Sequence, residues 1–376
     1  NLGPDYIITG GVPDTRGFEY LNGNQMEGFP VVGGQENPNG DTGQYDTLLS
    51  TYFIWNEVAG YPPHYSEILN KQPTEVHHSG SVYGPNSLFR FSFGSALLSD
   101  GYYGQKVEGK AGDFWWDEYA VDLTTGQAVP PTASAAEKAA HTGYLGYPLG
   151  GPQRLISFDP GQNRMGNGDF EVNLDGWSLN VSGGGAATMA RDSRTAAVGS
   201  ASLYVNVLSA TTSVENIQVE SPLVAIQAGQ EYTLRFWAKA EDWREIGVQV
   251  GDYSTSLLLT KEWQPYTLDF TVTVTRSSPV YFLLSREWPD VWLDGVEFYA
   301  GGADLFRRDF EHGIVLVNGT GVTQTVALGE VFRKIRGTQD PRVNDGATVT
   351  QVMLPPRDAL ILLRSHRLYL PMVVAN

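Results

Sequence analysis

The sequence contains no cysteine among its 376 residues. This absence excludes disulfides, thiolate metal sites and a cysteine nucleophile. No apolar run approaches the roughly 20 residues that a membrane-spanning helix needs, so we expect no membrane span. Residues 1–5 hold neither a cationic segment nor a long apolar one. We therefore expect that any signal peptide has been removed or lies upstream in a larger parent.

Cationic side chains are scarce, because 25 Lys and Arg face 42 Asp and Glu, for a formal net charge of −17. This balance argues against a nucleic-acid partner, which needs clustered cations to displace the counterions of phosphates. Aromatic residues are abundant, with nine Trp and nineteen Tyr. Some of them fill cores. A surplus on loops would suit sugar binding, because the apolar face of a pyranose stacks on an aromatic ring.

Three stretches of different pattern follow one another. Residues 1–158 alternate short strands, Gly- and Pro-rich loops and helix-like spacing, which predicts an α/β region. Residues 163–302 alternate apolar and polar positions at period two, which predicts an all-β sandwich. Residues 303–376 contain further short strands and an apolar tail, so we predict a small C-terminal β domain that packs against the first stretch. The clearest expected helices are 48–58, 86–98 and 133–140, and the clearest expected strands are 202–207, 232–238, 266–272 and 313–318.

Seven short motifs occur in order within the second stretch. They are NGDFE (167–171), GW (176–177), GSASL (199–203), AGQEY (228–232), FWAKA (236–240), WQPY (263–266) and VWLDGV (291–296). In this order and spacing the stretch resembles the family 4/9 group of carbohydrate-binding modules. The resemblance implies a jelly-roll β-sandwich that binds a glycan.

The same resemblance implies a structural calcium ion held by oxygen atoms of the first and last motifs. Carried onto this sequence, its ligands are Glu171 and Asp294, with backbone oxygens near Gly168 and Gly199. Calcium takes several oxygen ligands and can pin two distant strands together. The alternative is that both carboxylates only cap turns.

Three aromatic residues are candidates for sugar contact. Trp243, Tyr253 and Trp288 lie in less regular sequence beside charged residues, where a large ring suits a stacking platform better than a core position. Gln218 or Gln249 would then fix the register of the sugar by hydrogen bonding. The aromatic residues for which we favour core packing are Trp177, Phe236, Trp263 and Trp292.

The flanking stretches carry a second resemblance. Motifs of the last stretch are similar to the terminal β domain of certain glycoside hydrolases, and motifs of the first are similar to the end of the (β/α)-barrel before it. A complete barrel needs about 250 residues, so we expect a partial barrel, as the C-terminal part of a longer enzyme or as a degenerate domain. The motifs are RRDFEHGIVLVN (307–318), NDG (344–346) and LPPRDALIL (354–362), and upstream LNGNQMEGF (21–29), RFSFGSALLSDGYY (90–103), WWDEY (115–119) and YLGYPLG (144–150).

Glycoside cleavage generally needs two carboxylates. Glu27 follows an apparent strand, where barrel enzymes place catalytic groups; the alternative is a solvated loop residue. Asp117 and Glu118 follow two tryptophans that could raise a carboxyl pKa and line a sugar subsite, unless they form a structural turn. The pair His77-His78 lacks further ligands at suitable spacing, so we do not expect a metal there.

Together these features favour an extracellular or cell-surface glycoside hydrolase, present as its C-terminal part, with an embedded glycan-binding module. Its partners would be a polysaccharide or oligosaccharide and the missing N-terminal part of the same enzyme. The alternative is a non-catalytic glycan-binding or surface-structural protein. The glycan, the retaining or inverting mechanism and the activity of this chain alone stay open.

Overall fold

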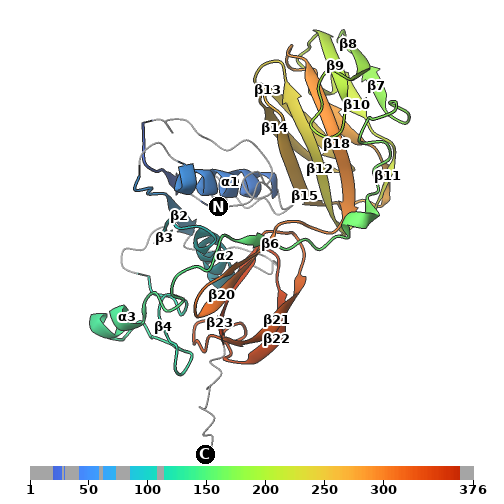
Figure 1. Ribbon diagram of the computed structural model, residues 1–376. Helices are drawn as coiled ribbons and strands as arrows, with labels where there is room; N and C mark the ends of the chain where they lie inside the picture. The colour runs from blue at the N-terminus through green and yellow to red at the C-terminus, as the bar shows by residue number, and fades with distance from the viewer. Residues whose placement is uncertain are drawn as a thin grey trace, which may run out of the picture.

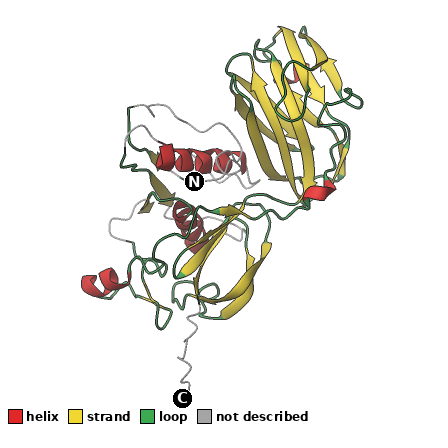
Figure 2. Cartoon of the chain, viewed as in Figure 1, coloured by secondary structure: helices red, strands yellow, loops and turns green. Residues whose placement is uncertain are grey.

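The computed structural model describes residues 20–27, 29, 42–58, 62–72, 85–107 and 114–364. Residues 5–11, whose sequence predicts a short buried strand, lie outside the described residues, as do the His77-His78 pair and the apolar tail at 368–374. Figures 1 and 2 show a strand-rich sandwich beside a second body that combines a strand-rich part with helices. Among the described residues, no helix is both long enough and apolar enough to cross a membrane.

The sandwich consists of two five-stranded antiparallel sheets. One, which we call the β13 sheet, has the order β14-β13-β17-β10-β7, and the other, the β12 sheet, has the order β15-β12-β18-β9-β8. The strands are β7 (Ser178–Val181), β8 (Ala186–Asp192), β9 (Ser202–Ser209), β10 (Ile217–Glu220), β12 (Glu231–Ala240), β13 (Arg244–Val250), β14 (Tyr253–Leu259), β15 (Gln264–Thr271), β17 (Val280–Leu283) and β18 (Val291–Ala300). A separate ribbon pairs β11 (Val224–Ile226) with β16 (Arg276–Ser278).

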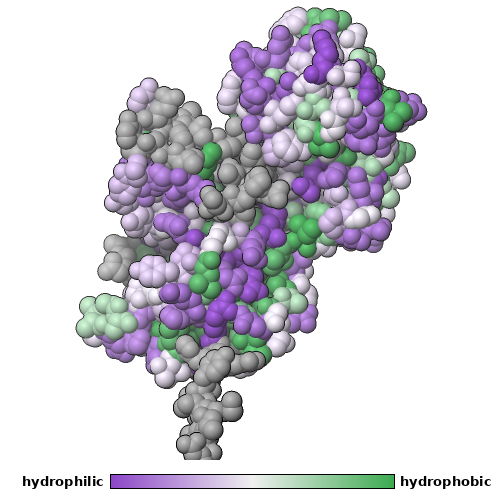
Figure 3. Space-filling model, viewed as in Figure 1, coloured by the Kyte–Doolittle hydropathy of each residue, from purple (hydrophilic) through white to green (hydrophobic). Residues whose placement is uncertain are grey.

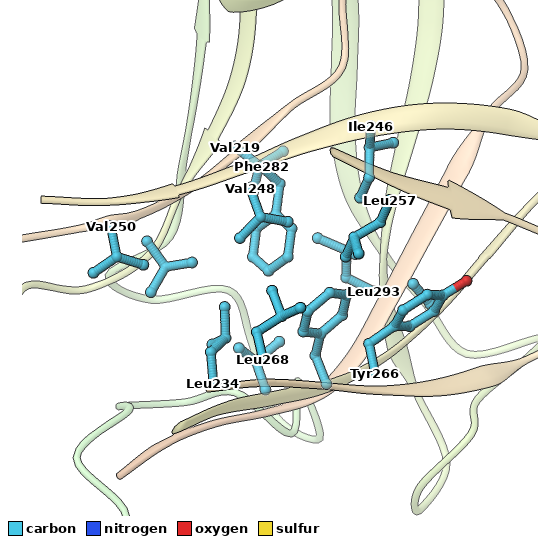
Figure 4. Packing of buried hydrophobic residues seen from close by; sticks show 14 of the residues in the cluster. Val219, Leu234, Ile246, Val248, Val250, Leu257, Tyr266, Leu268, Phe282 and Leu293 are labelled. Atoms are coloured by element: carbon cyan, nitrogen blue, oxygen red, sulfur yellow. The ribbon is translucent and has the colours of Figure 1, made fainter. Parts of the chain in front are cut away.

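The core of the sandwich follows from the period-two pattern. Alternate residues of each strand point inward, so Val248 and Phe282 of the β13 sheet meet Leu234 and Leu268 of the β12 sheet (Figure 4). All four side chains are fully buried. The structure therefore confirms the β-sandwich predicted from the alternating pattern.

The first stretch forms a small parallel sheet. Strands β1 (Gln25–Glu27), β2 (Glu67–Gln72) and β3 (Tyr102–Val107) pair in sequential order. Helix α1 (Thr42–Val58) connects the first two strands, and α2 (Pro85–Leu97) connects the second and third. The expected helices at 48–58 and 86–98 are thus present. Successive parallel strands joined by helices are βαβ units, but only three such strands occur in the described residues, and their membership of a barrel stays a prediction.

The last stretch forms a six-stranded sheet in the order β22-β21-β23-β20-β19-β6. Its bounds are β6 (Gln153–Arg154), β19 (Leu305–Asp309), β20 (Gly313–Asn318), β21 (Gln324–Lys334), β22 (Thr348–Leu354) and β23 (Asp358–Arg364). Every residue of β20 is buried, because alternate side chains enter separate apolar clusters on the two faces of the sheet. Strand β6 comes from the first predicted stretch, so the two stretches share this sheet.

Helix α2 packs against the sheet of the last stretch. A Cβ atom at Gly94 would lie 2.5 Å from the Cβ of Ala359, so glycine permits the close approach of helix and sheet. Arg90 of α2 donates from Nε and Nη2 to the two carboxylate oxygens of Asp358, at 2.8 and 2.7 Å. A shared apolar core and a buried ion pair thus join the first and last stretches into one body.

Three minor elements complete this body between Trp115 and the sandwich. Strands β4 (Val121–Asp122) and β5 (Gln127–Ala128) form a hairpin. Helix α3 (Ala135–His141) covers the expected helix at 133–140, and the Ser134 hydroxyl accepts a hydrogen bond from the Glu137 N–H at its N-terminus.

The sandwich is attached at both ends. Ser157, before it, and Gly302, after it, exchange hydrogen bonds, with Ser157 N–H donating to the Gly302 carbonyl at 2.8 Å and Gly302 N–H donating to Ser157 Oγ at 2.7 Å. Next to this clamp, the carboxyl groups of Glu231, Asp269 and Asp304 are buried between the sandwich and the last stretch. On the face seen in Figure 3, hydrophilic residues predominate and apolar patches are small.

Candidate functional site

The outward face of the β13 sheet carries a row of polar side chains around one aromatic ring. The cross-strand register places Tyr281 of β17 between Gln249 of β13 and Glu220 of β10. All three side chains are half-buried. The row ends in exposed serines on the edge strands, Ser254 opposite Gln249 and Ser178 opposite Glu220.

A second row lies beside the first and has an apolar centre. Leu283 is only 6% exposed and pairs with Gly247, which adds no side chain, and with Gln218. Gln218 in turn pairs with exposed Asn180, whose Nδ2 donates to Glu220 Oε1 at 3.4 Å. The centre of this second row therefore pairs an apolar side chain with a glycine, and amides lie toward its end.

This face can hold a polyhydroxylated ligand. The ring of Tyr281 offers a stacking surface, and the amides of Gln249 and Gln218 can both donate and accept hydrogen bonds. Glu220 supplies an acceptor for sugar hydroxyls. In the part of the chain that the structure describes, no group of three or more Asp, Glu or His side chains is arranged to bind a metal.

Two predicted sugar-contact residues are exposed beside this face. Trp243 precedes β13 and is 55% exposed, and Trp288 lies in the loop after β17 and is 61% exposed. The buried Arg244 guanidinium joins the two loops by donating to the carbonyls of Leu284 and Pro289. Both rings therefore stand on loops at the same end of the β13 sheet.

The prediction for Tyr253 needs correction. Its side chain is 9% exposed, and its ring stacks on that of Phe270, with centroids 4.3 Å apart and an angle of 8° between the planes. Although Gly251 and Asp252 before it read as a loop, Tyr253 begins β14 at an inward position. Its ring belongs to the core and is not an exposed platform.

The outward face of the β12 sheet also carries aromatic residues, but a cation covers them. Lys239 Nζ lies 4.9 Å from the ring centre of Trp292 and 5.5 Å from that of Trp263. The indole N–H groups of both tryptophans donate within the sandwich, to Asp192 and Thr195 respectively. These two rings are half-buried and lie beside Lys239, whereas the exposed rings of Trp243 and Trp288 lie at one end of the β13 sheet.

The predicted calcium ligands lie around one loop. Asp294 Oδ2 accepts the N–H groups of Ala197 and Val198 at 2.8 and 2.9 Å, and Glu171 Oε1 accepts that of Ser200 at 2.8 Å. A Cβ at Gly199 would lie 2.2 Å from Glu171 Oε1, so glycine lets the loop lie over the carboxylate.

The carboxylates of Glu171 and Asp294 are oxygen ligands of the type that calcium takes. Burial raises the pKa of Asp294, and the neighbouring charge of Glu171 raises it further, so a cation beside both would relieve their repulsion. Calcium takes six to eight oxygens. The two carboxylates would hold part of that shell, and backbone carbonyls and water would have to supply the rest.

Two of the three predicted catalytic residues, Asp117 and Glu118, are neighbours in one turn, and the third, Glu27, belongs to β1. Glu27 ends β1 opposite Leu69 of β2, at the carboxyl end of a parallel strand. Asp117 is 2% exposed, and its Oδ2 accepts the N–H groups of Thr338 and Gln339 at 2.7 and 2.8 Å. Those bonds tie two loops together, which favours the structural turn that was the alternative for Asp117.

Glu118 has the more unusual environment of the adjacent pair. It is buried, and its Oε1 accepts a hydrogen bond from Asn344 Nδ2 at 2.8 Å. Burial raises the pKa of Glu118 to about 7, although Arg90 and Asn344 act in the opposite direction. Glu118 borders a hollow of the molecule together with Trp115 and Tyr119, which agrees with the expected aromatic surroundings and leaves its catalytic role a prediction.

Sequence analysis missed Tyr281, Glu220 and Asn180. Tyr281 lies in Val280-Tyr281-Phe282-Leu283, a nearly continuous apolar run that reads as core from both sides. The phenol oxygen of Tyr281 was the available signal, since a polar ring between two inward residues of one strand must face outward.

Comparison with known proteins identifies the sandwich. Residues 162–287 match the family model of the carbohydrate binding domain CBM_4_9. No curated protein sequence matches the chain. The match to the family model therefore agrees with the resemblance to the 4/9 group that the motifs of residues 163–302 predicted.

Solved structures that are similar to this chain include several carbohydrate-binding modules. A CBM4 module is 21% identical, with a TM-score of 0.31, over 36% of this chain and 99% of that one. The N-terminal cellulose-binding domain of Cellulomonas fimi β-1,4-glucanase C is 25% identical, with a TM-score of 0.28, over 36% and 95% of the two chains. The module TmCBM61, in complex with β-1,4-galactotriose, is 20% identical, with a TM-score of 0.28, over 37% and 99%.

The family match covers the strands that build both rows of the outward face, from β7 to β17. It leaves the first and last stretches unassigned. Residues 162–287 thus match the model of the carbohydrate binding domain CBM_4_9, and this stretch lies between two others that pack together as one body.

Proposed function

We propose that this chain binds a glycan chain on the outward face of the β13 sheet. The observation that carries the proposal is the row Gln249–Tyr281–Glu220, which lies within the stretch matched by the carbohydrate-binding family model. Trp243 and Trp288 would extend the contact at one end of the sheet.

The length of the face supports an extended ligand. Neighbouring strands lie about 4.8 Å apart, so five strands give a track roughly 19 Å across, enough for several consecutive sugar rings. The side chains along the track are mainly uncharged, and its carboxylate, Glu220, disfavours an acidic sugar. We therefore propose a neutral polysaccharide or oligosaccharide as the partner.

Affinity electrophoresis tests this proposal. Migration of the wild-type chain through gels containing soluble neutral polysaccharides should be retarded by at least one of them, and Tyr281→Ala should abolish most of that retardation. Tyr147→Ala is the matched control, because Tyr147 is exposed and lies outside the module. Equal retardation of the Tyr281→Ala and wild-type chains would place the glycan elsewhere.

A second candidate function is glycoside hydrolysis by a longer enzyme of which this chain is the C-terminal part. The sequential parallel order β1-β2-β3 with intervening helices favours it, since barrel enzymes are built from such units. Release of reducing sugar that is lost in Glu27→Gln would support hydrolysis. Retention on a polysaccharide without any release favours the non-catalytic glycan-binding or surface-structural alternative.

Three further expectations belong to this proposal. The division at 1–158, 163–302 and 303–376 would separate a partial barrel, the module and a closing β domain, and the missing N-terminal part would be a partner of the first. A structural calcium would be held by Glu171 and Asp294. An extracellular or cell-surface location would bring the module to its polysaccharide.

A further inference from the structure

The small parallel sheet of β1, β2 and β3 has two unlike faces. Met26 and Ile68 are buried in the apolar cluster that includes residues of α1 and α2 (Figure 1). Because successive side chains of a strand point to opposite faces, the neighbouring positions lie on the other face. There the register aligns Gln25, Glu67 and Tyr102, which we call the β2 row. Gln25 and Tyr102 are exposed and Glu67 is half-buried, so this second face is open to solvent.

Two tyrosine rings stand together at the β3 end of the β2 row. Tyr65 precedes Glu67 by two residues and therefore lies on the same face. Its ring stacks on that of Tyr102, with centroids 5.9 Å apart and an angle of 29° between the planes. Tyr65 is 50% exposed and Tyr102 is 56% exposed. Each ring therefore offers a ligand a flat apolar surface that the core does not use.

The backbone holds both tyrosines in place. The Tyr65 N–H donates to the Asn22 carbonyl at 2.8 Å, and the Tyr102 N–H donates to the carbonyl of buried Ser66 at 2.7 Å. Because the strands and the contact between the rings fix the tyrosines before any ligand arrives, little conformational entropy is lost when one binds.

The rest of the β2 row consists of an amide beside a carboxylate. Gln25 Nε2 donates to Glu67 Oε2 at 2.7 Å. A Cβ atom at Gly104 of β3 would lie 2.3 Å from Glu67 Oε1, so glycine allows the carboxylate to lie over that strand. The amide can both donate and accept hydrogen bonds, and the carboxylate can accept several. This pair suits a ligand that presents many hydroxyl groups.

The β2 row has the same residue types as the face proposed to bind a glycan on the module. That face places Gln249, Tyr281 and Glu220 on three adjacent strands. The β2 row likewise places one glutamine, one glutamate and one tyrosine on three adjacent strands. Two sheets of different architecture thus present the same set of side chains to solvent.

We propose that the β2 row and Tyr65 form a second binding site for a neutral glycan, in the body outside the module. A sugar ring would stack on Tyr65 or Tyr102, and its hydroxyl groups would form hydrogen bonds with Gln25 and Glu67. The choice of a glycan as ligand rests on the proposed function. The site itself is separate, because its residues lie outside the stretch that matches the carbohydrate-binding family model.

The chemistry of the β2 row disfavours other ligands. The Glu67 carboxylate repels acidic sugars and nucleic acids, as does a formal net charge of −17. An apolar partner would cover the rings but would also remove water from the carboxylate and its amide neighbour without replacing their hydrogen bonds, which is costly. A neutral polyhydroxylated ligand satisfies both the rings and the polar pair.

Affinity electrophoresis of four chains tests the second site, in gels that contain mixed-linkage β-glucan, arabinoxylan or galactomannan. The chains are the wild type, Tyr281→Ala, the double variant Tyr65→Ala/Tyr102→Ala, and the triple variant that combines all three changes. We expect Tyr281→Ala to keep a residual retardation and the triple variant to lose it. In the wild-type background, the double variant should weaken retention about three- to tenfold, the loss expected for aromatic contacts.

A substitution of the polar pair provides a second measurement. Gln25→Leu removes the amide at an exposed position and should weaken the residual retention of the Tyr281→Ala chain about threefold. Tyr147→Ala is the matched control, because Tyr147 is a 79% exposed tyrosine outside both sites, and it should change nothing. Melting curves establish that each variant is folded, and Gln25→Leu keeps the test decisive if the double tyrosine variant does not fold.

Three outcomes separate this site from the module face. Complete loss of retardation in Tyr281→Ala alone would overturn the second site and leave the module face as the site of binding. Residual retardation that neither the tyrosine substitutions nor Gln25→Leu reduces would also overturn it. Full retardation of Tyr281→Ala that the triple variant loses would support the second site and contradict the module face.

Discussion

Asp269 Oδ2 accepts the backbone N–H of Asp304 at 2.6 Å, and the carboxyl groups of both residues are fully buried. Asp269 belongs to β15 of the module, and Asp304 precedes β19 of the neighbouring sheet. Glu231 of β12 is buried beside them and accepts a hydrogen bond from Gln324 at 2.8 Å. The cation near this cluster is Arg154, whose Nη2 lies 3.9 Å from Asp304 Oδ1.

The contact that Glu231, Asp269 and Asp304 make between the module and the neighbouring sheet should weaken as the pH rises. Burial raises the pKa of Glu231 from its ordinary value of 4.5 to about 7, and burial together with the neighbouring carboxylates keeps the pKa of Asp269 well above its usual range. A carboxyl whose pKa is raised by folding stabilises the protein below its unfolded pKa, and this contribution is lost as the pH passes the folded value.

We therefore expect the melting temperature of the wild type to fall relative to that of Glu231→Gln between pH 5 and pH 8. The difference should approach about 3 kcal/mol of unfolding free energy at the alkaline end. Thermal melting of both chains across this range measures it. Melting temperatures that change in parallel would show that Glu231 is ionised throughout.

The exposed tryptophans of the module should contribute to glycan retention. Trp243→Ala and Trp288→Ala each remove a ring that is more than half exposed, so neither should lower the melting temperature by more than a few degrees. On a polysaccharide that retards the wild type, we expect each variant to lose about three- to tenfold in affinity. Unchanged retention by both variants would remove these rings from the site.

Chelation should destabilise the module if calcium binds between Glu171 and Asp294. A ligand that binds only the folded form stabilises it by about 2.7 kcal/mol at a hundredfold excess over its Kd. Melting with and without EDTA measures this contribution. Glu171→Gln should abolish the response, and identical wild-type melting curves in the two buffers would argue against the ion.

The ion pair of Arg90 with Asp358 should hold α2 on the last sheet. Arg90→Met leaves a buried carboxylate without its partner, so we expect unfolding free energy to fall by about 3–5 kcal/mol. Chemical denaturation measures the change. Arg342→Met is the control, because the Arg342 side chain is 94% exposed and a surface pair contributes little. Equal stability of the two variants would contradict a structural role for the buried pair.

The elements that sequence predicted well depend on local pattern. Period-two alternation located β9, β12 and β15, and helical spacing located α1 and α2. Gln218 and Gln249, proposed as register-fixing side chains, do lie on one face, because each occupies an outward position of its strand. This alternation of inward and outward side chains holds along a strand however the strands are arranged.

Other features depend on partners far away in the chain. Asp269 occupies an outward, polar position of β15 that predicts solvent exposure, yet residues 303–304 cover it. Tyr253 reads as a loop residue because Gly251 and Asp252 precede it, and only the pairing of β14 with β13 turns its ring inward. The side-chain oxygen of Gln105 likewise finds its donor only in the indole N–H of Trp116. No single-sequence pattern encodes these tertiary contacts.

The clamp between Ser157 and Gly302 has a mechanical consequence. A module attached through a single segment can rotate about it, whereas two segments joined to each other by hydrogen bonds restrict that rotation. The outward face of the β13 sheet, which we propose binds the glycan, therefore keeps a fixed orientation relative to the neighbouring body. A glycan chain bound to the module would therefore keep a constant orientation relative to the rest of the molecule.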